Sequence, residues 1–235
     1  MQDEQQRPDL SLFLASAAHD MKNSVGMMSG TLETLLADEA TKQLPAYQQI
    51  AHMLYETRRL NDNLIQLLAL YKDVGKRSYP FDPEPQALVD FVEQIESQYR
   101  ILFSSKNIEL QLEFPDDLVW VFDADLVTGV IGHAITNAIR YTRDRIALIV
   151  RAEGDFLELR VEDNGEGYPP SMIEMGLEMS AAMSGGVNFK TGSTYLGLYF
   201  SGEVAKMHTH RGRVGGVTLE NGGSLGGGCF VLRLP

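Results

Sequence analysis

His19 is followed directly by Asp20, and Asn23 lies four residues after the histidine. On a helix, residues four apart share one face, so the imidazole and the amide would project side by side. A carboxylate beside an imidazole can hold the proton of one ring nitrogen, which leaves the other nitrogen able to attack an electrophile. The amide could orient a water molecule or a phosphoryl oxygen. Taken alone, an isolated His-Asp pair is more typical of a solvated helix face.

A second group of residues suited to ligand binding is Asp163-Asn164-Gly165-Glu166-Gly167, which follows an apolar, alternating segment. A carboxylate at the end of a strand can accept a hydrogen bond, for example from the amino group of adenine. The two glycines after it let the backbone approach a ligand closely. A calcium-binding loop or a plain turn would have the same residues.

A third group lies on one helical segment, residues 133–142. His133, Asn137, Arg140 and Tyr141 are spaced by four, three and one residues, which forms a single polar stripe on an otherwise apolar helix. An amide oxygen at Asn137 suits Mg²⁺, Arg140 suits phosphate, and Tyr141 offers a stacking face. The alternative is the edge of a helix at the domain surface.

The segment 192–198, Gly-Ser-Thr-Tyr-Leu-Gly-Leu, is expected to open another helix. Backbone N–H groups and the positive dipole at a helix start favour phosphate. The segment lacks the Gly-Lys-Ser/Thr ending of a P-loop, and it does not match a dinucleotide-binding fingerprint either.

The elements that carry these residues divide into two parts. Up to residue 80, two long segments with few helix breakers flank Pro45, which predicts a helical hairpin. Apolar residues repeat along both segments every 3.5 residues on average, which forms an apolar seam. Two such helices bury little apolar surface unless another element packs against them. We therefore expect a dimer that forms a four-helix bundle, with an intramolecular bundle packed on the second domain as the alternative. The seam residues are Leu14, Ala18, Met21, Val25, Met28, Leu32 and Leu35, then Met53, Thr57, Leu60, Leu64, Leu67, Tyr71 and Val74.

The second part begins after a stiff boundary formed by Pro80, Pro83 and Pro85. Periodicity predicts helices over 87–102, 125–141, 169–183 and 195–208, the second of them capped by Asp123 or Asp125. Strands are expected over 108–114, 118–122, 146–152, 156–162, 214–220 and 229–234. The predicted fold class is α+β: a hairpin domain over 1–78, and over 79–235 an α/β sandwich with one mixed sheet and helices on one face.

Composition excludes several functions. The 235 residues have a formal net charge of −12, which disfavours nucleic acid and anionic membrane surfaces as partners. A single cysteine excludes an internal disulfide framework. No apolar run is long enough to span a bilayer, and no signal peptide opens the chain. We expect a cytoplasmic protein without direct membrane insertion.

The four groups of residues, in this order, resemble the motifs of the transmitter core of a two-component sensor histidine kinase. Residues 19–23 resemble the H-box, 133–142 the N-box, 163–167 the first glycine box and 194–198 the second. The resemblance extends from about Leu12 to Pro235. It implies a dimerisation and phosphotransfer hairpin followed by an ATPase domain of the histidine-kinase and gyrase type.

This resemblance implies a role for each matched residue. His19 would be the phosphoacceptor, Asp20 its orienting carboxylate and general base, and Asn23 the amide that positions water for dephosphorylation of the partner. Asn137 would hold Mg²⁺, and Asp163 would bind the adenine amino group. The remaining residues implied to contact ATP are Arg140, Tyr141, Gly165, Gly167, Lys190 in a lid over 170–193, Thr194, Gly197 and Leu198.

The resemblance also implies partners: a second copy of the chain and the receiver domain of a response regulator, which would take the phosphoryl group from His19 on an aspartate. Because no sensor segment is present, either the chain is truncated or a separate sensor protein supplies the input. The alternative function is a histidine phosphotransfer protein or scaffold whose second domain does not bind ATP.

Three residues depart from the family pattern. Ser24 stands where the H-box has proline, His133 replaces the first asparagine of the N-box, and Tyr195 replaces a glycine of the second glycine box. These departures bear on the rate of autophosphorylation more than on the fold.

Overall fold

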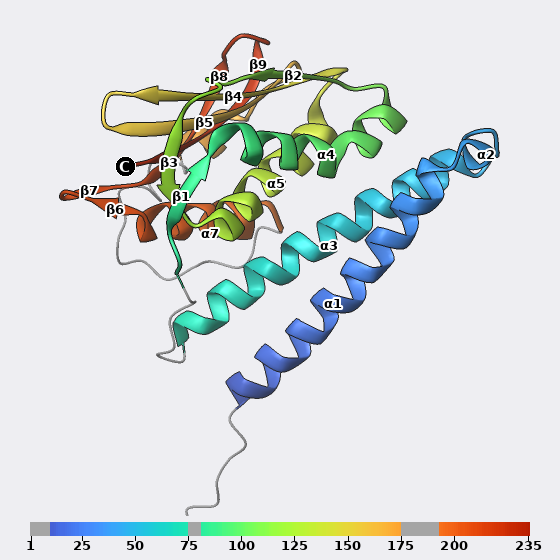
Figure 1. Ribbon diagram of the computed structural model, residues 1–235, viewed down its shortest axis with the longest axis horizontal. Helices are drawn as coiled ribbons and strands as arrows, with labels where there is room; N and C mark the ends of the chain where they lie inside the picture. Colours follow the sequence, from blue (N-terminus) through green and yellow to red (C-terminus); the bar gives the residue numbers. More distant parts are fainter. Residues whose placement is uncertain (1–9, 75–80, 175–192) are drawn as a thin grey trace, which may run out of the picture.

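The computed structural model describes residues 10–74, 81–174 and 193–235, without the side chains of 10–19, 22, 65–74 and 193–196. Two long helices, α1 (Leu10–Ala37) and α3 (Tyr47–Val74), form the predicted hairpin and pack along each other. The short helix α2 (Glu39–Lys42) lies at the turn, where Asp38 accepts a hydrogen bond from the backbone of Ala40 (Figure 1). Pro45 lies in this turn, between α2 and α3, so it interrupts neither long helix.

The second part of the chain contains one sheet with helices on one face, as the sequence predicts (Figure 1). The sheet has the strand order β2-β4-β5-β9-β8, with β2 and β4 parallel and the other neighbours antiparallel. Its strands are β2 (Glu109–Glu113), β4 (Arg145–Glu153), β5 (Phe156–Asp163), β8 (Gly216–Gly222) and β9 (Gly227–Leu234). The covering helices are α4 (Leu88–Lys106), α5 (Ala124–Tyr141) and α7 (Ser193–Met207).

Two small strand pairs lie outside the main sheet. Strand β1 (Glu84–Ala87) pairs with β3 (Val119–Phe122), and β6 (Thr209–His210) pairs with β7 (Arg213–Val214). The prolines at 83 and 85 were expected to mark only a boundary, so β1 corrects that prediction. Proline is tolerated there because β1 is an edge strand with a single neighbour. The expected domain boundary at 78 lies outside the described residues.

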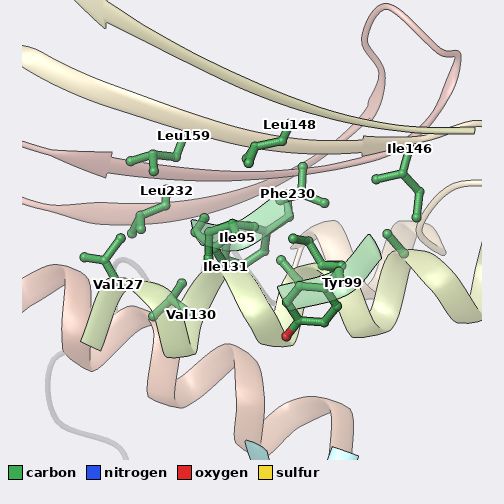
Figure 2. Packing of buried hydrophobic residues seen from close by; sticks show 14 of the residues in the cluster. Ile95, Tyr99, Val127, Val130, Ile131, Ile146, Leu148, Leu159, Phe230 and Leu232 are labelled. Carbon is green, nitrogen blue, oxygen red and sulfur yellow. The ribbon is translucent and has the colours of Figure 1, made fainter. Parts of the chain in front are cut away.

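The hydrophobic core fills the space between the sheet and helices α4 and α5 (Figure 2). Ile131 and Val127 of α5 face Leu148, Leu159 and other aliphatic residues of the strands. Tyr99 of α4 is fully buried, and its hydroxyl points away from the strands. That hydroxyl lies 2.6 Å from the position that a Cβ would take at Gly132, so α5 can approach α4 here only without a side chain.

Helix α5 begins where the sequence predicts. The Asp123 side chain accepts a hydrogen bond from the backbone N–H of Leu126 at 3.0 Å, and its other oxygen accepts one from Asp82 at 3.0 Å. The backbone N–H of Asp123 itself donates to Nε2 of His208 at 3.1 Å. The start of α5 is therefore fixed to the segment that enters the domain and to the end of α7.

The hairpin packs through α3 on the helical layer of the second part of the chain, where α3 contacts α4, α5 and α7. Tyr55 is buried and donates to the backbone oxygen of Thr136 at 3.4 Å. The Thr136 hydroxyl lies 3.2 Å from a carboxylate oxygen of Asp62 and 2.8 Å from the backbone oxygen of Gly132, so two acceptors share one proton. This intramolecular packing was the alternative to the dimer, and it uses a different face of α3 from the predicted seam.

A partly buried ion pair accompanies this contact. Arg58 is buried on α3, pairs with Glu33 of α1 at 2.8 Å, and places its guanidinium 4.7 Å from the centre of the Tyr99 ring. The interface between hairpin and sandwich is therefore polar at its centre. Interfaces between domains of one chain are commonly of this kind.

The predicted seam is largely uncovered in the single chain. Val25 and Thr57 are buried and Leu32 and Leu64 are half-buried, but the other described seam residues are exposed: Met21, Met28, Leu35, Met53 and Leu60. The packing of one chain on itself therefore leaves part of the predicted seam exposed.

Burial raises the pKa of Asp62 to about 7, although Thr136 and Arg58 oppose the shift. Because the folded-state pKa lies above the unfolded value, this carboxyl favours folding when protonated, and the contribution is lost as pH rises toward 7. Asp62→Asn should remove that loss, so its melting temperature should exceed that of the parent by an amount that grows between about pH 4 and pH 7 and then stays constant. Several degrees are expected, because about 1 kcal/mol shifts a chain of this size by roughly 2–4 °C. Parallel pH profiles for Asp62→Asn, the parent and the exposed control Asp117→Asn would contradict this prediction.

Candidate functional site

The H-box residues lie on α1. The backbone of His19 belongs to this helix, but its side chain lies outside the described residues. Asp20 and Asn23 are exposed. Ser24, which replaces the family's proline, donates its hydroxyl to the backbone oxygen of Asp20 at 3.0 Å, and the helix continues without interruption to Ala37. The kink that a proline would introduce is therefore absent.

Asp163 ends strand β5 inside the sandwich, with only 6% of its surface exposed. One carboxylate oxygen, Oδ1, accepts hydrogen bonds from the backbone N–H groups of Gly165 at 2.7 Å and Gly228 at 3.3 Å. Burial raises the pKa of Asp163, while these two N–H groups act in the opposite direction. The bonds fix the carboxylate in one orientation, so its second oxygen can accept a donor from a ligand.

Glycines surround this carboxylate because side chains would not fit. A Cβ at Gly165 would overlap the backbone oxygen of Tyr141, and one at Gly227 would overlap the backbone of Asp163. A Cβ at Gly228 would lie 2.9 Å from the second oxygen of Asp163 and 3.1 Å from the Tyr168 ring. The sequence indicated the first glycine box but not Gly227 and Gly228, although the run of glycines from 226 to 228 could have suggested them.

Two asparagines that the sequence analysis did not assign hold the loops around this site. Asn164 accepts four hydrogen bonds at its side-chain oxygen, from the hydroxyl of Thr142 and the backbone N–H groups of residues 143–145. The side-chain amide of Asn221 in β8 accepts a hydrogen bond from the backbone N–H of Tyr168 at 2.7 Å and donates one to the backbone oxygen of Tyr168 at 2.8 Å. Gly167, with φ of +84°, lies against this amide, where a Cβ would come within 2.6 Å.

On α5, the polar stripe divides into a buried and an exposed part. His133 is buried, which lowers the pKa of its imidazole to about 4, so the ring is neutral at pH 7. Asn137 is half-buried, and its amide nitrogen lies 2.9 Å from Nε2 of His133. Arg140 and Tyr141 are exposed at the end of the helix, with the guanidinium 5.4 Å from the ring centre.

In the second glycine box, the described residues have packing contacts. Gly197 is buried in α7, and a Cβ there would overlap the imidazole of His133. The glycine is thus required by a side chain of α5, and Leu198 is half-buried against the core. Lys190 lies outside the described residues, as do the side chains of Thr194 and Tyr195; of the lid, the described part is helical over 170–174.

The structure therefore joins Tyr141, Asp163 and Gly165 into one cluster, and His133, Asn137 and Gly197 into a second one further back along α5. The H-box residues belong to neither cluster, because α3 lies between α1 and helices α5 and α7 (Figure 1). A cleft of about 740 Å³ lies at the junction of α1, α3 and α4. Its lining includes Asn23, Glu33, Arg58, Asp62 and Tyr99, but no residue of the two clusters.

Residues 122–235 match the family of histidine kinase-, DNA gyrase B-, and HSP90-like ATPases. Over 226 residues, 95% of this chain, the sequence is 22% identical to the sensor protein SrrB of Staphylococcus aureus strain MRSA252. The match to the same protein of strain NCTC 8325 has the same extent. In both cases the chain spans only 37% of the relative's length.

Solved structures with the same fold include full-length ShkA in complex with AMPPNP, at a TM-score of 0.58 and 18% identity. This match covers 94% of our chain and 45% of that one. A nucleotide-free crystal form of the catalytic domain of histidine kinase ThkA matches with a TM-score of 0.53 and 20% identity. It covers 66% of our chain and 95% of that one.

Residues 122–235 form a domain that matches the histidine kinase-, DNA gyrase B- and HSP90-like ATPases. Over nearly its whole length the chain is homologous to the sensor protein SrrB, and it shares its fold with the structures of ShkA and histidine kinase ThkA described above. Within the described parts of the chain, no helix has the length and apolar character needed to cross a bilayer.

Proposed function

We propose that this chain is a protein-histidine kinase core that transfers the γ-phosphoryl group of ATP to His19 and from there to an aspartate of a response-regulator receiver domain. In the first step, a ring nitrogen of His19 attacks the γ-phosphorus, the bond to the bridging β,γ-oxygen breaks, and ADP leaves. In the second step, a receiver carboxylate attacks the phosphorus and His19 leaves. Such transfers depend on positioning and charge neutralisation more than on covalent assistance.

The observation that carries the proposal is the orientation of Asp163. Its Oδ1 accepts backbone bonds from Gly165 and Gly228, whereas its second oxygen accepts no hydrogen bond from the described residues. A buried carboxylate that is held at one oxygen and has the other available is suited to the amino group of adenine. A buried carboxylate costs free energy unless it is hydrogen-bonded, so this arrangement supports a ligand that donates.

Residues of α5 and the adjoining loops are suited to the rest of the nucleotide. The backbone oxygen of Tyr141 lies against Gly165, and the exposed ring of this residue is suited to flank the base. The exposed Arg140 guanidinium is available to phosphate. Asn137 is the proposed Mg²⁺ ligand. No group of three or more acidic, histidine or cysteine side chains among the described residues could hold a metal by itself. A single amide oxygen fits Mg²⁺, which commonly takes one or two protein oxygens and completes its shell with phosphates and water. Bound there, Mg²⁺ would neutralise phosphate charge.

The hairpin would carry the phosphoryl group. Asp20, next to His19, is proposed to hold the proton of one imidazole nitrogen while the other attacks. Because α3 separates α1 from α5 and α7 in the single chain, His19 of a second copy, or a rearranged hairpin, would have to reach the nucleotide. Asn23 is proposed to position water for hydrolysis of the aspartyl phosphate on the regulator.

Asp163→Asn tests the nucleotide site. The substitution keeps a group that can accept from Gly165 and Gly228, but it presents an NH₂ group to the adenine amino group. We expect the Kd for Mg·ATP, measured by titration calorimetry, to rise about ten- to a hundredfold, which corresponds to the loss of a hydrogen bond to a charged group. Asp117→Asn, at an exposed position, should bind as the parent does. If the parent itself fails to bind millimolar Mg·ATP, the phosphotransfer-protein alternative replaces the kinase.

His19→Ala tests the phosphoacceptor. Incubation with γ-labelled ATP should give acid-labile, base-stable label on the parent and none on His19→Ala, while nucleotide affinity and melting temperature stay the same. Asn23→Ala should be labelled like the parent but should prolong the lifetime of a phosphorylated receiver domain. Label that persists in His19→Ala would assign the phosphoryl group to another residue.

The exposed part of the predicted seam supports a homodimer as the working state. Leu60 lies on this part of the seam with 53% of its surface exposed, and Leu44, at the turn after α2, has a similar exposure of 51% away from it. A charge placed at Leu60 would be buried without a partner in a four-helix bundle. Light scattering should therefore report a dimer for the parent and for Leu44→Glu, but a monomer for Leu60→Glu. Equal masses for the two variants would contradict the proposed seam.

A further inference from the structure

We propose that His133 is a positioning residue, whose imidazole holds the Asn137 amide by its nitrogen so that the amide oxygen faces the Mg²⁺ that accompanies ATP. The inference rests on the nucleotide site proposed above. It gives a role to the residue that departs from the N-box pattern, and this residue acts through Asn137.

The first observation is the geometry within α5. His133 and Asn137 are four residues apart on one face of the helix, and the Asn137 amide nitrogen lies 2.9 Å from Nε2 of the ring. An amide nitrogen can only donate, so Nε2 is the acceptor in this bond. The oxygen at the other end of the same planar amide is thereby turned away from His133.

The second observation is the contact with α7. The backbone at Gly197 approaches the ring so closely that a Cβ would overlap Nε2, Cε1 and Cδ2 of His133. The ring is therefore confined between Asn137 on its own helix and the backbone of α7. Confinement matters because a buried ring that cannot turn keeps its acceptor nitrogen at the amide.

The chemical need for such a residue follows from the amide itself. Asparagine has an oxygen and a nitrogen at the two ends of a nearly symmetric group, and rotation by 180° exchanges them. Only the oxygen binds Mg²⁺. The asparagine found in the family pattern could either donate to or accept from Asn137. With the imidazole proton on Nδ1, Nε2 of His133 can only accept, so it holds the amide nitrogen and leaves the amide oxygen for Mg²⁺.

The experiment compares nucleotide binding with and without Mg²⁺. For each variant, the Kd of a fluorescent ATP analogue is measured in Mg²⁺ and in excess EDTA, and the ratio of the two values reports the contribution of the metal. His133→Leu fills a similar volume but cannot accept a hydrogen bond, so we expect its ratio to fall about tenfold, as when a metal ligand loses its outer partner. His133→Gln keeps an acceptor at similar reach and should give an intermediate ratio. Binding in EDTA should change little in either variant.

The matched control is His208→Gln. His208 is also a buried histidine next to α5, but it contacts the backbone of Asp123 and Val204 and neither cluster of the site. Its Mg²⁺ ratio should equal that of the parent, even if its melting temperature falls. An unchanged ratio in His133→Leu, or an equal fall in His208→Gln, would overturn the positioning role.

A double-mutant cycle tests the contact with α7. It also provides an alternative test of the positioning role if His133→Leu does not fold. Gly197→Ala should displace the ring and lower the Mg²⁺ ratio in the parent, but it should have little further effect in His133→Ala, where the overlapping atoms are gone. Additive effects of the two substitutions would contradict the proposed confinement. The two proposals fail differently: a parent that binds no nucleotide refutes the kinase, whereas Mg²⁺-dependent binding that is indifferent to His133 refutes only the positioning role.

Discussion

Burial of helix α5 on nearly all sides is the constraint on which the rest of the structure depends. The sheet covers one side with aliphatic residues, α4 and α7 flank it, and α3 of the hairpin lies on the side away from the sheet. Polar groups on such a helix need partners, because an unpaired buried group costs about 1–3 kcal/mol. Thr136 finds them in Asp62 and Gly132, and Asn137 in His133. The same packing that satisfies the helix therefore orients the residues of the site.

Close approach of the backbone to neighbouring groups is the second constraint. It explains two sets of glycines, one around the Asp163 carboxylate and one between packed helices. At Gly165, Gly227 and Gly228 the missing side chains let three segments meet around the Asp163 carboxylate. At Gly132 and Gly197 the missing side chains make room for Tyr99 and His133 instead. Glycines in the motifs are thus as much a matter of helix packing as of access to a ligand.

Local patterns in the sequence were sufficient for much of this architecture. The Asp123 cap of α5, the paired strands β8 and β9, and the place of Asp163 at the end of a strand all depend on neighbouring residues, and all are found as predicted. The pairing of β1 with β3 was missed because prolines at 83 and 85 argue against a strand unless its neighbours are known. The contact of His133 with Gly197, the loop bonds of Asn164 and the packing of α3 on α5 join residues far apart in the chain, which periodicity cannot pair.

The hairpin illustrates why one periodic pattern can hide two interfaces. On α3, Tyr55, Arg58 and Asp62 face the ATPase domain, whereas Met53 and Leu60, seven residues apart, lie on a different face and stay exposed. Residues two positions apart project in nearly opposite directions on a helix, so the two faces are separate surfaces. The spacing of apolar residues predicts only the face with Met53 and Leu60, because the centre of the face toward the ATPase domain is formed by Arg58 and Asp62. Docking against the ATPase domain and pairing along the seam therefore do not compete for the same side chains.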